Sequence, residues 1–307
     1  MTEKVYVAKE STSLAIQGDT QEILTKLSGG GGITDTVVLA LLSNNDAQID
    51  WAFRQNGIGS ALNAAFGLNS AALEACNTVN EIAASTAALD AIKTNADAVV
   101  VCCKNPVLVQ KFSDEDIIAV GAGYKKFSVA DLVMLNYNGK DTKFRVVHKD
   151  YLTKGKIVLL SEDCVSQKEW NTTSRNNYST STIRAHLNST VLNGFSQKIQ
   201  NAITTPDLPC HDYKVAIILK DKIWLPSCTE VGYATDQYAP VEGSVFDYYN
   251  GASNDKRIKE FNNNAVYWWL RTPSAAFASD AWRVSNNGSA SSNSVQPSEG
   301  VAFAFEI

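Results

Sequence analysis

The segment from Ser60 to Asp97 has the composition of a helix. Twelve of its thirty-eight residues are alanine, only five are charged, and Gly67 is its single glycine. Alanine is the strongest helix former, so intrinsic propensity favours helix throughout. From Ser70 onward we expect one continuous helix of roughly 28 residues, a rod about 42 Å long.

Larger apolar side chains recur along this segment at three-and-four spacing, which predicts one apolar stripe. The stripe consists of Leu73, Cys76, Val79, Ile82, Leu89 and Ile92. A helix so poor in charge needs a partner. It either packs within the chain, against residues 36–42 and 49–53, or associates with copies of itself in a homo-oligomeric stalk, for which a trimer is favoured.

The chain changes in character near Phe127, where short β-rich runs separated by polar turns begin. Asn138-Gly139 lies between two such runs and predicts a β-hairpin. Ser181 or Thr182 and Ser196 are expected to cap two later helices. The fold class is therefore α+β, with an N-terminal helical region followed by an α+β domain.

This division predicts four regions. Residues 1–32 form an attachment segment that ends in four glycines, a flexible joint. Residues 33–103 form an alanine-rich helical oligomerisation region, residues 104–126 a linker, and residues 127–307 the α+β domain.

Composition excludes several partners. The formal net charge of −5 offers no basic surface for nucleic acid. The sequence has no apolar run of about 18 residues, so we expect no membrane insertion, and no signal peptide is expected at its start. The six cysteines are too sparse for a disulfide scaffold and are expected to be free thiols.

The most distinctive residues lie near the end of the chain. They are the run Tyr267-Trp268-Trp269-Leu270-Arg271-Thr272-Pro273, the turn Asn286-Asn287-Gly288-Ser289 and the strand Gly300-Val301-Ala302-Phe303, preceded by Tyr178 to Asn188 and by Lys222 to Val231. This order of motifs resembles a family of bacterial and phage domains of unknown biochemical function. The resemblance implies a C-type-lectin-like fold for residues 127–307. Ala302 stands where the family has arginine, so no ligand role is carried over for that position.

The order of the segments resembles that of a phage tail-fibre or receptor-binding protein. This implies a virion protein, made in the cytoplasm of a bacterial host, that contacts other tail proteins through its N-terminus. Its C-terminal domain would recognise a host-surface glycan or protein. The alternative is a structural virion or bacterial-surface protein whose lectin-like domain packs against a neighbouring subunit without binding a receptor.

Two sets of residues are candidates for this domain's function. Trp268, Trp269 and Arg271 are expected to be structural. One indole should lie in the core and the other should be partly exposed or lie under a loop, and the guanidinium should form an ion pair or stack on a ring. Ligand contacts are expected from the polar, turn-rich segment that follows. The residues predicted to make them are Trp282, Arg283, Asn286, Asn287, Ser289 and Asn293.

We expect no enzymatic activity, no cofactor and no metal site. The side chains of Cys210-His211-Asp212 should diverge, and no cysteine pair has the spacing of a zinc site. Gln296-Pro297 lacks the following acid that a calcium site would need. A glycan-cleaving enzyme needs two carboxylates across a cleft, and the candidates Glu162, Asp163 and Asp280 are scattered along the chain.

Overall fold

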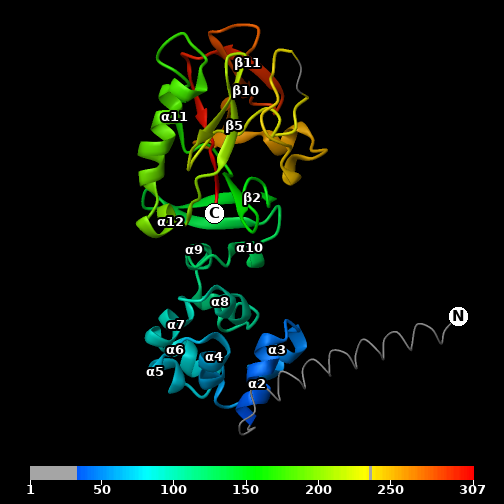
Figure 1. Ribbon diagram of the computed structural model, residues 1–307. Coiled ribbons are helices and arrows are strands. Elements are labelled where there is room, and N and C mark those ends of the chain that lie inside the picture. Colours follow the sequence, from blue (N-terminus) through cyan, green and yellow to red (C-terminus); the bar gives the residue numbers. More distant parts are fainter. Residues whose placement is uncertain (1–32, 235–236) are drawn as a thin grey trace, which may run out of the picture. The chain divides into compact units, whose positions relative to one another are not determined.

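The computed structural model describes residues 33–234 and 237–307 (Figure 1). The chain forms two compact units, Met1–Ser113 and Asp114–Ile307, here called unit 1 and unit 2. The described part of unit 1 is helical, and unit 2 contains both sheets and helices. The predicted α+β class is therefore confirmed. The expected attachment segment, residues 1–32, lies outside the described residues.

Unit 1 is a bundle of short helices. They are α2 (Ile33–Leu42), α3 (Asp46–Ala52), α4 (Ile58–Phe66), α5 (Ala71–Glu74), α6 (Val79–Ala84), α7 (Thr86–Ile92), α8 (Ala96–Cys102) and the 3-10 turn η1 (Val109–Lys111). Helix α4 is central and contacts α2, α5, α6 and α8. Its Gly59 donates a backbone hydrogen bond to the Cys76 carbonyl (3.1 Å), and a Cβ at Gly59 would lie 2.0 Å from the Leu73 carbonyl oxygen. Only glycine permits this close approach.

The predicted continuous helix from Ser70 to Asp97 is wrong. Four polar side chains within it accept hydrogen bonds from backbone amides and each starts a new helix: Ser70, Thr78, Ser85 and Asn95. Such caps compete with helix continuation, so alanine content alone does not decide helix length. Much of the predicted stripe, including Leu73, Ile82 and Ile92, is buried inside unit 1. Packing within the chain thus takes up this apolar surface, but the main contacts of α5 to α8 are with α4 and with one another, and not with the expected partners, residues 36–42 and 49–53.

Unit 2 begins with two short helices, α9 (Asp114–Ala119) and α10 (Gly123–Lys126), in the region expected to be a linker. A four-stranded sheet follows. In spatial order its strands are β1 (Leu132–Tyr137), β2 (Lys140–Lys149), β3 (Ile157–Ser161) and β13 (Ala304–Glu306). The predicted hairpin is confirmed: β1 and β2 are antiparallel and join through Asn138 and Gly139, both with positive φ.

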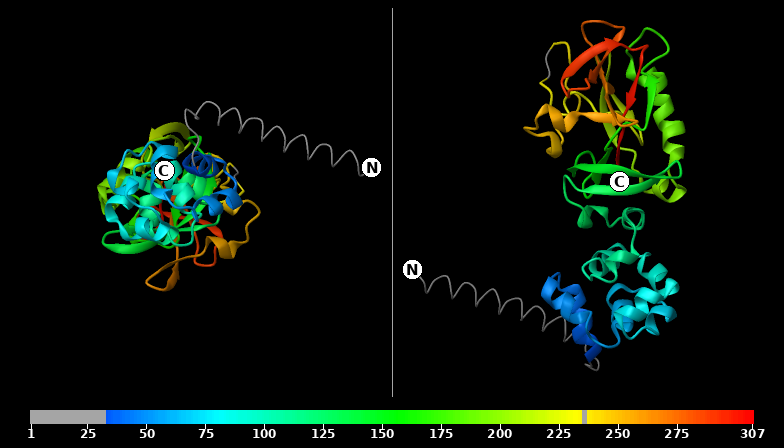
Figure 2. Two further views of the ribbon diagram at one scale, coloured as in Figure 1. Left: turned by 90° about the horizontal axis from the view of Figure 1, so that it is seen from below. Right: turned by 180° about the vertical axis from the view of Figure 1, so that it is seen from behind.

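A five-stranded sheet forms the other part of unit 2. Its order is β11 (Ala290–Ser294), β10 (Asp280–Val284), β9 (Trp268–Pro273), β12 (Ser298–Val301) and β4 (Ser166–Glu169). Strands β12 and β13 belong to different sheets, so the last residues of the chain run from one sheet to the other (Figure 2). The aromatic rings of Phe144, Phe195, Phe303 and Phe305 pack together beside the four-stranded sheet.

Helices and two hairpins complete unit 2. Helix α11 (Thr182–His186) continues through a π turn (Leu187–Val191), and α12 (Gln197–Ala202) follows. Ser181 and Ser196 cap α11 and α12, as the sequence predicts. The hairpins are β5 (Asp207–Asp212) with β6 (Val215–Lys220), and β7 (Lys259–Phe261) with β8 (Asn264–Val266); 3-10 turns occur at Tyr178–Thr180, Leu192–Gly194, Asp247–Tyr249 and Asn254–Arg257.

Trp268 and Trp269 are both fully buried, so of the two alternatives expected for the second indole, partly exposed or under a loop, exposure is wrong. Their strand, β9, lies in the middle of the five-stranded sheet, and both indoles find partners. The Trp268 indole N–H donates to the Arg257 carbonyl (2.9 Å), and that of Trp269 donates to the Lys168 carbonyl (3.0 Å). Adjacent residues point to opposite faces, and in this sheet both faces are covered.

Candidate functional site

The site begins with an irregularity in the motif strand β9. On the neighbouring strand β10, Ala281 lies opposite Pro273 and Arg283 lies opposite Trp269, so two residues of β9 are extra. The Arg271 amide leaves the ladder and donates to the Pro226 carbonyl at 2.9 Å. A bulge re-aims side chains. Here it accompanies an Arg271 side chain that is fully buried.

Arg271 forms a two-pronged ion pair with Glu230, as the sequence predicts for a structural arginine. Its Nη1 and Nη2 donate to Glu230 Oε2 and Oε1 at 2.5 and 2.8 Å. Further bonds go to the carbonyls of Leu225 (3.0 Å) and Pro209 (3.1 and 3.2 Å). Burial by itself lowers the pKa of Arg271, but the Glu230 carboxylate more than offsets this and holds the pKa above its usual range.

The local sequence explains why Glu230 stands here. Ser227 and Glu230 form a reciprocal capping box, since the Glu230 amide donates to Ser227 Oγ and the Ser227 amide donates to Glu230 Oε2, both at 3.0 Å. The Tyr151 hydroxyl donates to Glu230 Oε1 at 2.6 Å. Burial, together with the Glu230 charge, raises the pKa of Tyr151. Both carboxylate oxygens of Glu230 thus accept hydrogen bonds from groups within the protein.

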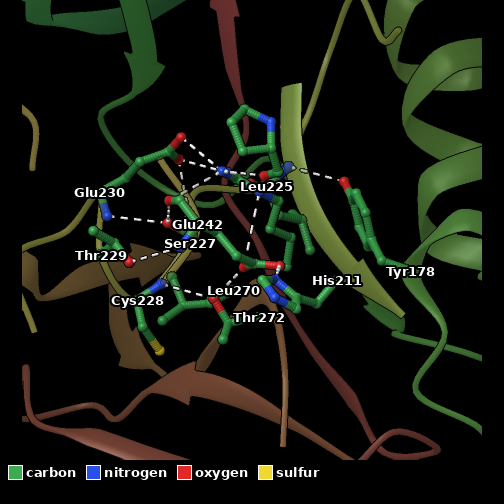
Figure 3. Close-up of polar contacts among 12 residues, drawn as sticks. Tyr178, His211, Leu225, Ser227, Cys228, Thr229, Glu230, Glu242, Leu270 and Thr272 are labelled. Carbon is green, nitrogen blue, oxygen red and sulfur yellow. Dashed lines mark hydrogen bonds and ion pairs between the residues drawn. The ribbon is translucent and has the colours of Figure 1, made fainter. Parts of the chain in front are cut away.

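A second buried carboxylate, Glu242, is only partly satisfied (Figure 3). Its Oε2 accepts a hydrogen bond from Thr272 Oγ1 at 2.6 Å. Its Oε1 has no hydrogen-bond partner and lies 3.5 Å from His211 Nδ1, which also has none. Arg271 Nε lies 4.0 Å from Glu242 Oε2, so two buried carboxylates, Glu230 and Glu242, share one guanidinium.

His211 connects this buried cluster to the surface. The histidine is on β5, and its side chain is 16% exposed to solvent. It lines a hollow of about 660 Å³. The other lining residues come from the β5–β6 turn, the loop after residue 236 and the segment after β9, and they are Lys214, Gln237, Tyr238, Pro240, Ala275 and Ala276. None of the seven is acidic, so the hollow offers cationic, amide and aromatic groups.

Of the predicted ligand contacts, Trp282 lies next to the hollow: its indole N–H donates to the Tyr238 carbonyl at 3.0 Å. The other predicted residues lie on the β10–β11 hairpin and its turn. Arg283 forms an ion pair with Glu299 and stacks over the Tyr267 ring at 4.0 Å. Its guanidinium is therefore already engaged within the sheet.

The remaining predicted contacts are close in space but line no part of the hollow. Asn293 donates to Glu299 Oε1 at 3.4 Å. Asn287 Oδ1 accepts from the Ser289 amide (3.1 Å) and hydroxyl (2.8 Å), which closes the turn. Asn286 is exposed. The hairpin thus holds all six predicted residues together, and only Trp282 contacts the wall of the hollow.

His211, Lys214, Tyr238 and Glu242 are not among the residues that the sequence predicts for the site. The tripeptide Cys210-His211-Asp212 is expected to have no catalytic role. In the structure Asp212 accepts hydrogen bonds from Ser179, whereas His211 faces Glu242. Burial is the main cause that raises the pKa of the Cys210 thiol, which disfavours a thiolate nucleophile.

The scattered carboxylates considered for glycan cleavage have other partners. Glu162 forms an ion pair with Arg145, and Asp163 accepts from the Glu260 amide at 3.0 Å. Asp280 accepts from Ser279 Oγ at 2.9 Å. Glu162 and Asp163 border a second, open groove of about 600 Å³, and Asp280 is not among its lining residues.

Residues 33–234 and 237–307 contain no group of three or more His, Cys, Asp or Glu placed to hold a metal ion. They also contain no helix of the length and apolarity that a bilayer crossing needs. All six cysteines are buried thiols.

Residues 154–307, half of the chain, match the family described as Domain of unknown function (DUF6273). The chain belongs to this family. The DUF6273 match includes the five-stranded sheet, the β5–β6 and β7–β8 hairpins and every described residue that lines the hollow. It also includes Arg271, Glu230 and Glu242, whereas Tyr151 and strands β1 and β2 precede it. No curated protein and no solved structure matches the chain.

Proposed function

We propose that the chain is a binding protein without enzymatic activity, a tail-fibre or receptor-binding subunit of a phage particle. In this proposal unit 2 has a C-type-lectin-like fold and recognises a glycan or protein on a host surface. The observation that carries it is the open hollow lined by His211, Lys214, Gln237 and Tyr238.

The chemistry of this hollow suits the recognition of polar, ring-shaped groups. Tyr238 offers an aromatic face, and Trp282, whose indole bonds to the Tyr238 backbone, adds a second ring next to it. Gln237 and Lys214 supply hydrogen-bond donors. A shallow site with few donors binds weakly, so several copies on one assembly would be needed for firm attachment.

The assignment to a phage particle rests on the order of the segments. A leader, a glycine run and a helical unit precede the recognition unit, and in the proposal residues 1–32 attach the protein to other tail proteins. We propose a trimer. Because the apolar stripe of unit 1 is largely buried within the chain, association would use other surfaces of the protein.

A second candidate function is supported by exposed apolar side chains. Val215 and Ile218 on β6, with Val241 and Phe277, are each between 60% and 63% exposed. Apolar side chains so exposed are common at interfaces between proteins. They favour the alternative of a structural virion or bacterial-surface subunit whose unit 2 packs against a neighbour.

Light scattering and a glycan array distinguish the two functions. For the receptor-binding function we expect a trimer that binds glycans on the array, with binding lost in Tyr238→Ala and kept in Ile218→Ser. For the structural function we expect no glycan binding, and self-association or binding to a purified tail protein that Ile218→Ser weakens. A monomeric chain that binds neither glycans nor such a protein would contradict both.

A further inference from the structure

We propose that the hollow beside β5 binds a sugar that carries an anionic group, a carboxylate or a phosphate, through His211 and Lys214. The inference rests on the proposed function and names the ligand class. Three features support it: the charges around the hollow, the unsatisfied pair beneath it, and the shape of its walls.

The first feature is the balance of charge at the surface of the hollow. Among the described residues that line it, Lys214 and His211 are the titratable side chains apart from the Tyr238 phenol, and none of these residues is acidic. Within the described part of the chain, Lys214 is exposed, has the Tyr213 ring 5.0 Å from its Nζ, and forms no ion pair. Its ammonium group is therefore available to an anion.

The second feature is the buried pair below. Glu242 Oε1 and His211 Nδ1 face each other at 3.5 Å, and neither has a hydrogen-bond partner. Glu242 is fully buried, and an unpaired buried carboxylate oxygen is costly. A protonated His211 would donate through Nδ1 to Glu242 and offer its other N–H to a ligand.

This pairing couples ligand binding to a proton. Among the described residues, Glu242 faces His211, Arg271 and Glu230 join Glu242 in the buried cluster, and Lys214 lines the hollow together with His211. With His211 protonated, two cations balance the two buried carboxylates, and Lys214 is left as the excess positive charge. An anion in the hollow stabilises the protonated imidazole, so ligand affinity should rise as pH falls.

The third feature is the apolar wall opposite the charges. Tyr238, Pro240, Ala275 and Ala276 line the same hollow, whose volume of about 660 Å³ is within the range of small-molecule sites. An aromatic ring and small apolar side chains suit the C–H face of a pyranose. A free inorganic anion would leave this wall unused, whereas an anionic sugar fills both halves of the site.

Calorimetric titration of the full chain with glucuronate, glucose 6-phosphate and glucose tests the inference. At least one of the two anionic sugars should bind about tenfold tighter than glucose, because its anionic group accepts a hydrogen bond from a charged side chain that glucose does not use. The tighter of the two identifies the anion as a carboxylate or a phosphate. Affinity for glucuronate, whose carboxylate stays ionised at neutral and mildly acidic pH, should rise as pH falls.

Two variants and a matched control locate the effect. Lys214→Gln should lose about tenfold in affinity for the anionic sugar and leave glucose binding unchanged. His211→Gln should abolish the pH dependence. Lys220→Gln is the control, since Lys220 is on the same hairpin, pairs with Asp207 at 2.9 Å and does not line the hollow.

The outcomes separate this inference from the proposed function. Equal affinity for glucose and both anionic sugars, or an equal loss in Lys220→Gln, would overturn the anionic-sugar site. If the chain also binds neutral glycans on the array, the receptor-binding function survives. No binding to any sugar or array glycan would overturn the site and the glycan-binding form of the function together.

Discussion

Replacing Arg271 by methionine should destabilise unit 2 by about 3–5 kcal/mol, the usual cost of removing one partner of a buried ion pair. Methionine keeps most of the side chain's length and apolar volume, so packing changes little. The main effect is on the fully buried Glu230, which loses its counter-ion and two hydrogen bonds of 2.5 and 2.8 Å.

The carbonyls of Leu225 and Pro209 also lose the donors that Arg271 supplies at 3.0 to 3.2 Å. Each buried acceptor left unsatisfied adds about 1 kcal/mol or more. Adding Glu230→Gln to Arg271→Met removes the uncompensated charge. This double variant should therefore recover part of the lost stability, a coupling that a double-mutant cycle measures.

Urea unfolding followed by tryptophan fluorescence is the assay, because five of the six tryptophans are in unit 2. In thermal unfolding of a domain of this size, each kcal/mol of lost unfolding free energy should lower the melting temperature by about 2–4 °C. Arg283→Met is the comparison, since its ion pair with Glu299 retains 17% and 13% side-chain exposure. If Arg271→Met costs no more than Arg283→Met, the central role assigned to the buried pair is wrong.

Three further predictions concern other parts of the chain. Asn95→Ala should cost unit 1 about 0.5–2 kcal/mol, measured by urea unfolding followed by circular dichroism, because Asn95 caps α8 through two amide hydrogen bonds of 3.0 and 3.1 Å. Burial raises the pKa of Tyr249. Above about pH 10 the Tyr249 phenol therefore loses its proton in the unfolded chain and keeps it in the folded state, so the free energy of unfolding falls with rising pH. In Tyr249→Phe this fall should be shallower by up to about 1.4 kcal/mol per pH unit. In a Trp51→Phe background, Trp282→Phe should remove the fluorescence that acrylamide quenches, whereas Trp269→Phe should leave it, because Trp269 is fully buried and Trp282 is not.

Local signals in the sequence predicted the elements whose causes are local. The Asn138-Gly139 turn lies where two residues must adopt positive φ, and Ser181 and Ser196 cap the helices that follow them. The same kind of signal divides the alanine-rich segment of unit 1 into short helices. Ser85 begins a new helix there although alanine surrounds it, because its hydroxyl accepts a backbone hydrogen bond at 3.2 Å.

The environment of a residue was harder to predict than its secondary structure. Trp268 and Trp269 were placed correctly on a strand, but their burial depends on segments far away in the sequence, since the Trp269 indole bonds to Lys168. The arginine of the same motif is expected to form an ion pair or to stack on a ring, and it forms an ion pair with Glu230.

The candidate site illustrates the same limit. His211 and Glu242 are separated by thirty residues, and no spacing rule connects them before the chain folds. The predicted contacts were chosen from one polar, turn-rich segment, and its small side chains mostly bond to one another within the β10–β11 hairpin. Trp282 borders the hollow because its indole is long enough to reach the Tyr238 carbonyl.

Binding of the fluorescently labelled full chain to a panel of bacterial cells tests the proposed function most directly. Tyr238→Ser changes the hollow, and Leu132→Ser changes a side chain that is 43% exposed on β1 and does not line it. We expect saturable binding to at least one strain, reduced about tenfold or more by Tyr238→Ser and unchanged by Leu132→Ser. Equal binding by both variants, or a folded chain that binds no strain, would contradict recognition through this hollow.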